Sequence, residues 1–246
     1  MAKRGALSGL GTCLYAGGSL ALGLAGLIGG RFSTAWQPVP DGLAYRVALA
    51  YLAGGLLLLG GLAMLMRRIG LERMGAAILA LMYLVFALLW LPRVIGFPQM
   101  IGAWLGFCEE LALALGAGVV LAASLGNRVA VRVGQVLFGL CVISFGLAHL
   151  MAVKETAAMV PKWFPPGQHF WAVATGVAHL LAGAAIAVGI QRVLAARLLA
   201  LMLVIFDVAV WIPMLIAQPH LQIMWAGNAL TLAMAGAAWI MGDARG

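Results

Sequence analysis

Hydrophobic residues along this chain form eight long runs that are separated by short polar breaks. Each run is roughly 18–25 residues long, which is what a helix needs to cross the hydrocarbon core of a bilayer. The runs do not alternate between polar and apolar residues, so they do not fit the strands of a membrane barrel. The sequence therefore predicts an all-α polytopic transmembrane helix bundle, with spans at 6–29, 47–66, 74–92, 101–125, 129–153, 170–190, 193–216 and 221–241.

One stretch of the chain occurs twice. The segment from Trp90 to Gly106 reappears as Trp211 to Gly227, with Trp, Pro, Ile and Gly residues identical at an offset of 121 positions. Each copy links two apolar runs, so the repeated unit is a membrane hairpin. The pattern predicts two four-helix repeats, 1–127 and 128–246, within one integrated membrane domain. An even number of helices in each repeat gives both repeats the same orientation, as parallel repeats related by an axis along the membrane normal.

Composition and charge agree with a membrane protein. The chain is 65% hydrophobic and 9% charged, with a net charge of +8. The basic residues lie in the breaks between runs and form no cluster that would bind nucleic acid. Ten of the fifteen fall on one side and five on the other, which predicts that the richer side, with both termini, is cytoplasmic. The richer side has Lys3, Arg4, Arg67, Arg68, Arg73, Arg128, Arg132, Arg192, Arg197 and Arg245.

Polar groups inside the spans are few, and all fall in the half of the membrane opposite the termini. Such groups are costly in lipid and usually face a cavity or a helix partner. They predict one outward-opening pocket with Asp207 and His179 at its base and Trp163 and Trp211 at its mouth. Separate helix–helix hydrogen bonds are the alternative. The candidate ligand-binding residues are Glu109, Glu110, His149, Trp163, His169, His179, Asp207, Trp211, His220 and Asn228.

Two details refine this prediction. Glu109 and Glu110 are adjacent, so their side chains point about 100° apart on a helix, and only one of them can face the pocket. Asp207 has the apolar Phe86 as its repeat mate, so the duplication is asymmetric at this position.

The sequence assigns no metal or cofactor. The four histidines lack a local ligand motif, although ligation between helices by His149 and His179 stays open. The three cysteines lie inside spans without a CxxC pair and are expected to be small packing residues.

Three stretches resemble the DoxX-like family of small membrane proteins. They are 145–149 (FGLAH), 159–171 (MVPKWFPPGQHFW) and 175–179 (TGVAH). The resemblance implies a duplicated, eight-helix version of a four-helix unit in the bacterial inner membrane. Members are linked to membrane redox complexes, including a thiosulfate:quinone oxidoreductase subunit. His179 departs from the family pattern, in which many members have Glu.

These features leave three functions open. The first is a redox-linked membrane subunit that binds a quinone or similar lipid-like ligand. The second is a non-enzymatic carrier or binder of a hydrophobic small molecule. The third is a scaffold that packs against other subunits of a membrane complex. Whether the protein is an enzyme is not decided by the sequence.

Overall fold

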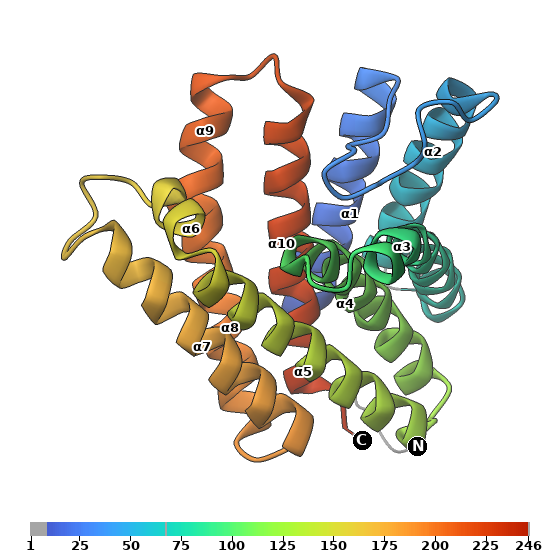
Figure 1. Ribbon diagram of the computed structural model, residues 1–246. Helices are drawn as coiled ribbons and strands as arrows, with labels where there is room; N and C mark the ends of the chain where they lie inside the picture. Colours follow the sequence, from blue (N-terminus) through green and yellow to red (C-terminus); the bar gives the residue numbers. More distant parts are fainter. Residues whose placement is uncertain (1–8, 67, 246) are drawn as a thin grey trace.

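The computed structural model describes residues 9–66 and 68–245, and the regular elements in those residues are helical. Within these two ranges, eight helical segments are long and apolar enough to cross a membrane, as the hydrophobic pattern predicts, so the chain is a polytopic α-helical membrane protein (Figure 1). The spans are α1 Gly9–Gly29, α2 Arg46–Leu65, α3 Ile69–Gly96, α4 Ile101–Ser124, α5 Arg128–Met151, α7 Gln168–Val188, the composite span Arg192–Ala217 and α10 Gln222–Asp243.

The composite span consists of three pieces: α8 (Arg192–Phe206), a π-helical turn η1 (Asp207–Trp211) and α9 (Ile212–Ala217). In the π-helical turn the Ile212 N–H donates to the Asp207 carbonyl, five residues back. Pro213 lies two residues after the end of this turn, in the first turn of α9. Proline has no N–H to donate and its ring crowds the preceding turn of a helix, and a wider turn relieves that crowding. Its counterpart Pro92 lies inside the continuous helix α3.

Most predicted boundaries lie within two residues of the observed ones. The exception is α3, which begins five residues earlier and ends four residues later than the predicted span 74–92. The extra residues include Glu72 in the first turn, because a charged side chain near a membrane surface can reach water, and the helix continues through Pro92. A short helix, α6 (Val153–Met159), was not predicted. Residues 6–8 of the first predicted helix, and Lys3, Arg4 and Arg67, lie outside the described residues.

The spans pack in a closed circuit. Each span contacts the next one in the chain, and α10 returns to pack on α1. The last helix of each half packs on the first helix of the other half, α4 on α5 and α10 on α1. In addition, α4 contacts α10 across the middle of the bundle. These two spans have the largest share of buried residues, 61% in the apolar stretch of α4 and 67% in that of α10. The core therefore lies around α4 and α10.

Glycine allows the closest of these approaches. A Cβ atom on Gly236 of α10 would lie 2.2 Å from the Tyr15 backbone nitrogen of α1. A Cβ on Gly18 would lie 2.4 Å from the Ala229 carbonyl oxygen. The backbones of α1 and α10 are thus in direct contact, as is common where small residues meet in membrane helix pairs.

The two turns that contain the repeated Trp and Pro residues have the same local geometry. The Trp104 indole N–H donates to the Pro98 carbonyl at 3.0 Å, and the Trp225 indole N–H donates to the Pro219 carbonyl at 2.8 Å. A Cβ on Gly106 would lie 2.3 Å from the Trp90 ring, and a Cβ on Gly227 would lie 2.3 Å from the Trp211 ring. The matching sequence therefore builds matching turns.

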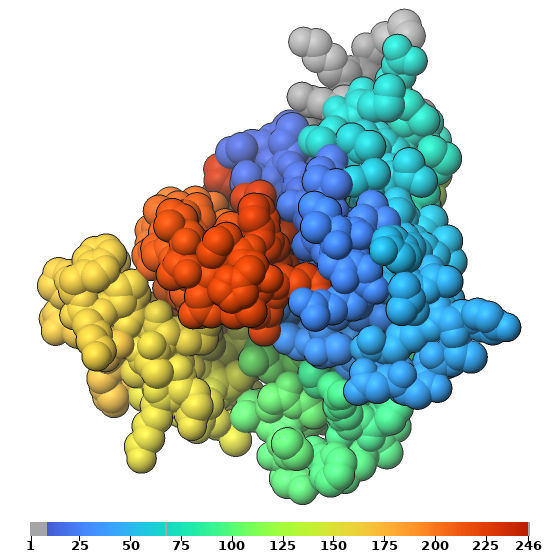
Figure 2. Space-filling view, turned by 90° about the horizontal axis from the view of Figure 1, so that it is seen from above, coloured from blue at the N-terminus to red at the C-terminus, as the bar shows by residue number. Residues whose placement is uncertain are grey.

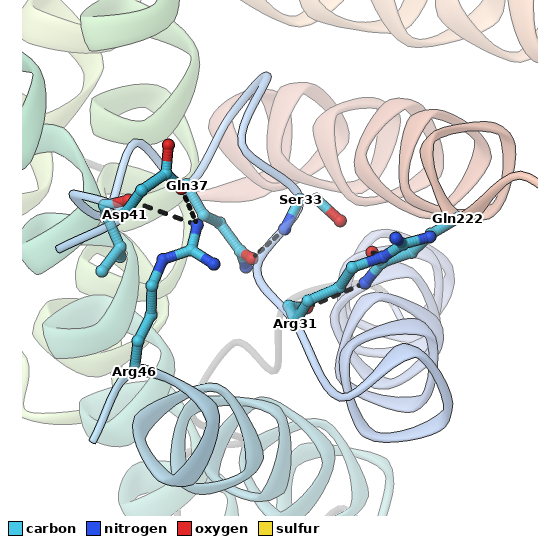
Figure 3. Close-up of polar contacts among 7 residues, drawn as sticks. Arg31, Ser33, Gln37, Asp41, Arg46 and Gln222 are labelled. Atoms are coloured by element: carbon cyan, nitrogen blue, oxygen red, sulfur yellow. Dashed lines mark hydrogen bonds and ion pairs between the residues drawn. The ribbon is translucent and has the colours of Figure 1, made fainter. Parts of the chain in front are cut away.

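These turns lie on one face of the bundle, here named the Trp/Pro face, which contains residues 30–45, 97–100, 152–167 and 218–221. Residues 30–45 form an ordered cover anchored by polar contacts (Figure 3). The Arg31 guanidinium donates to the Gln222 side chain at 2.9 Å, and Arg46 pairs with Asp41 at 3.1 Å. The Ser33 N–H donates to the Gln37 side chain at 3.0 Å. These contacts hold the buried side chain of Trp36 over the interior.

Candidate functional site

Three consecutive residues of α4 face three different environments, because each residue rotates by about 100° around a helix. Cys108 lines a groove between α4 and α5. Glu109 lines a separate cavity between the two halves of the chain. Glu110 is fully buried toward the first half, in the neighbourhood of Tyr15 and Tyr83. Of the two glutamates, only Glu109 faces the cavity.

This cavity, here named the central cavity, has a volume of about 340 Å³. It receives side chains from both halves: from α4, from α5 to α8, from η1 and α10, and from the 30–45 cover. Figure 2 shows the Trp/Pro face hollowed between the green start of α4, the yellow α6 region and the orange-red turn before α10. The polar and aromatic residues that line the central cavity include Trp36, Glu109, His149, Glu155, Thr156, His179, Trp211 and Thr231.

Two histidines from neighbouring helices meet in the central cavity. His149 lies near the end of α5, and His179 lies in the middle of α7. Their ring centroids are 4.9 Å apart, and the ring planes are inclined by 53°. Phe145 and Phe206 make edge contacts with this pair, at 6.1 Å from His179 and 6.3 Å from His149.

Hydrogen bonds to Thr175 define which ring nitrogen of each histidine carries the proton. His179 Nδ1 lies 2.8 Å from the Thr175 carbonyl oxygen, which can only accept, so Nδ1 must donate. The Thr175 hydroxyl donates to the Trp171 carbonyl at 2.7 Å. It must therefore accept from His149 Nδ1, 3.2 Å away. In neutral rings, Nε2 of both histidines is then an acceptor.

Glu109 adds a carboxylate to the same cavity. The Trp36 side chain lines the cavity beside this carboxylate and interacts with it. Trp36 also contacts Trp211 edge to face, with ring centroids 5.9 Å apart, and its carbonyl accepts from the Trp90 indole at 3.0 Å. The cover thus places an aromatic wall beside the carboxylate and joins the two halves above it.

The structure brings together four of the predicted site residues: Glu109, His149, His179 and Trp211 line the central cavity. Asp207 is buried in the π-helical turn, directly after the cavity-lining Phe206, but is not itself among the lining residues. Its Oδ1 atom has no hydrogen-bond partner among the described residues. Its place at the base of the pocket stays a prediction.

The remaining predicted site residues are not among those that line the central cavity. Trp163 is 72% exposed and packs on Phe164. His169 and His220 are exposed on the Trp/Pro face. The Asn228 amide donates to the Met224 carbonyl of its own helix at 2.9 Å.

Sequence reasoning did not identify Trp36 and Thr175 as parts of the site. Thr175 lies four positions before His179, on the same helix face, which is the available signal in the sequence. Trp36 lies in a long polar segment, and nothing in that segment indicates that it folds back over the interior. Among the described residues, no group of three or more His, Cys, Asp or Glu side chains could hold a metal ion.

Comparison with known proteins gives one match. Residues 138–240 match a family described as a domain of unknown function (DUF8561). The matched region contains His149, His179, Asp207 and Trp211, whereas Glu109 lies outside it. The match covers less than half of the chain and assigns no DoxX-like relationship. No curated protein and no solved structure matches the chain.

Proposed function

We propose that the central cavity binds a hydrophobic molecule through a hydroxyl group, with a membrane quinol as the ligand that fits best. The observation that carries this proposal is the pair of Nε2 acceptors of His149 and His179 in one cavity with Glu109. A ligand that donates hydrogen bonds satisfies these acceptors. A ligand with only carbonyl oxygens would displace water from these acceptors and leave them unpaired, which is costly.

The surroundings of the polar groups favour an aromatic or similarly flat ligand. Trp36, Trp211, Phe145 and Phe206 surround the polar groups. A mostly apolar cavity with a few converging polar groups is the usual form of a small-molecule site. Glu109 and the histidines can accept the proton that a hydroxyl releases on oxidation, because carboxylate and imidazole groups exchange protons readily. In this proposal the chain positions the quinol and accepts its two protons, and a redox cofactor of a partner subunit takes the two electrons as the quinol becomes the quinone.

We propose further that the two halves arose by duplication and are parallel repeats, with the Trp/Pro face outside and both termini in the cytoplasm. The matching turns support this, as does the way in which each half packs its last helix on the first helix of the other. The resemblance to the DoxX-like family supports a redox-linked role in a bacterial inner membrane.

A ligand titration tests the proposed function. Purified protein in detergent is titrated anaerobically with decylubiquinol and, separately, with decylubiquinone, and tryptophan fluorescence is followed. Quinol is expected to bind roughly fivefold more tightly than quinone, because one additional hydrogen bond contributes about 1 kcal/mol.

Variants localise the effect. Glu109→Gln and His179→Phe are expected to weaken quinol binding about tenfold, the equivalent of about 1.4 kcal/mol. His220→Phe, on the exposed turn, serves as the matched control and should bind as the unmodified protein does. Equal affinity for quinol and quinone, or equal loss in the control, contradicts the proposal.

A further inference from the structure

A second hollow lies on another side of α4, between α4 and α5, and does not share the polar groups of the central cavity. It has a volume of about 620 Å³. Its walls are apolar and include side chains that are exposed on the lipid-facing surface of the bundle, such as Leu140 and Leu147. Trp104 and Phe107 are in edge-to-face contact at the end of this hollow nearest the Trp/Pro face, with ring centroids 6.4 Å apart. We call this hollow the lateral groove.

Two thiols from different helices meet in the lateral groove. Cys108 of α4 and Cys141 of α5 are both buried, and their side chains are close enough to interact with each other. The Ser144 side chain interacts with Cys108 in the same way. All three residues line the groove. The cysteines were expected to be small packing residues, but the fold brings these two into one groove from positions 33 residues apart in the chain.

We propose that Cys108 and Cys141 form a redox-active dithiol that is oxidised by a lipid-soluble quinone bound in the lateral groove. One S–S bond forms and two S–H bonds break. The two electrons and two protons released by the thiols convert the quinone to the quinol. Ser144 is placed to donate a hydrogen bond to the Cys108 thiolate when its proton leaves for the quinone, since it is the polar neighbour of Cys108 in the groove.

The position of the thiols selects the class of oxidant. They are reached through an apolar groove whose walls continue into the lipid-facing surface, so charged oxidants such as glutathione disulfide are excluded from it. A quinone is hydrophobic, accepts two electrons and has a flat ring that fits beside Trp104 and Phe107. The volume of the groove is in the usual range for a site of a small molecule.

This inference does not rest on the function proposed for the central cavity. Cys108 and Glu109 face different sides of α4, and the lining of the groove includes neither histidine of the central cavity. The two sites can therefore fail or succeed separately in experiment.

Thiol counting by mass spectrometry tests the inference. Reduced protein in lipid nanodiscs is incubated anaerobically with decylubiquinone, then denatured and alkylated, and the modified cysteines are identified. We expect Cys108 and Cys141 to resist alkylation unless a reductant is added, while Cys13, which is exposed on α1, is alkylated throughout. One quinol should form for each protein molecule, measured by its absorbance.

Single variants make the result decisive. Cys108→Ser and Cys141→Ser should each abolish quinol formation and leave the remaining thiol free to react, whereas Cys13→Ser should change neither result. All three should retain quinol binding in the central cavity. If diamide forms the disulfide but decylubiquinone does not, the quinone assignment is wrong. If neither oxidant protects the two thiols from alkylation, the whole inference is overturned.

Discussion

At the scale of single residues, the direction in which a side chain of α4 points decides whether it meets the groove, the central cavity or the buried core. Helical geometry alone predicts that Glu109 and Glu110 cannot share a site, but only the packing of α4 decides which one faces the cavity. Likewise, His149 and His179 are 30 positions apart, so their contact depends on how α5 and α7 cross and not on any local motif. Thr175 completes the arrangement by bonding to both rings.

Replacing Thr175 with Val distinguishes the two hydrogen bonds that Thr175 makes with the histidines. The His179 bond uses the backbone carbonyl and should survive, whereas the His149 bond uses the hydroxyl and should be lost. Nitrogen-15 NMR of histidine-labelled protein should show an unchanged tautomer for His179 and altered ring-nitrogen chemical shifts for His149. Quinol affinity should fall about fivefold, or about 1 kcal/mol. An unchanged His149 spectrum would rule out this hydrogen-bond assignment.

Glu110 provides a test of the opposite kind. Its side chain is fully buried, and neither carboxylate oxygen has a hydrogen-bond partner among the described residues. Burying a carboxyl group without partners costs free energy, so Glu110→Gln should leave the melting temperature unchanged or raise it. Glu110→Gln should also leave ligand binding intact, in contrast to Glu109→Gln. A drop in melting temperature of several degrees would show that the carboxylate has a stabilising partner.

At the scale of elements, the positions of the spans are predictable because lipid requires long apolar helices, and seven of the eight spans lie close to the predicted boundaries. The polar segments are not predictable in this way. The cover at 30–45 and helix α6 lie outside the membrane pattern, and their shape depends on tertiary contacts such as that between Arg31 and Gln222. The π-helical turn at Asp207 was also not anticipated, although Pro213 is its local signal.

The two Trp/Pro turns predict paired effects of glycine substitution. In Gly106→Ala and Gly227→Ala, the new Cβ would overlap the Trp90 or Trp211 ring, so each variant should lose about 1–3 kcal/mol of stability. Gly118→Ala on α4 is the control, because a Cβ there meets no atom within 4 Å. Thermal unfolding in detergent measures all three. If only one of the two turn variants is destabilised, the turns are not equivalent.

At the scale of the whole molecule, the two ends of the helix bundle carry different features. The Trp/Pro face carries the cover and the mouth of the central cavity. On the opposite face, arginines bind the ends of helices: Arg132 donates to the carbonyls of Ile186 and Ala187, and Arg73 donates to Ser124. A cation at the C-terminal end of a helix is favourable, so these residues stabilise the bundle. The same residues are part of the charge asymmetry from which we predict a cytoplasmic location for this face.

Orientation is tested by reporter fusions. A phosphatase reporter, which is active only outside the cytoplasm, should be inactive when fused after Gly246 and active when inserted after Gln99 on the Trp/Pro face. A fluorescent protein that folds only in the cytoplasm should give the reverse result at both positions. Phosphatase activity after Gly246 would contradict the predicted topology.

The central claim is that one cavity, lined by Glu109, His149 and His179, holds a hydrophobic molecule with a hydroxyl group. Native mass spectrometry of the protein released from mild detergent tests it most directly, without assuming which ligand is present. The account predicts a bound hydrophobic molecule whose fragments contain a hydroxyl group, and predicts that it is absent from the Glu109→Gln/His179→Phe double variant but retained in His220→Phe. A folded protein that carries no such molecule after incubation with decylubiquinol, or a double variant that retains it fully, would contradict the claim.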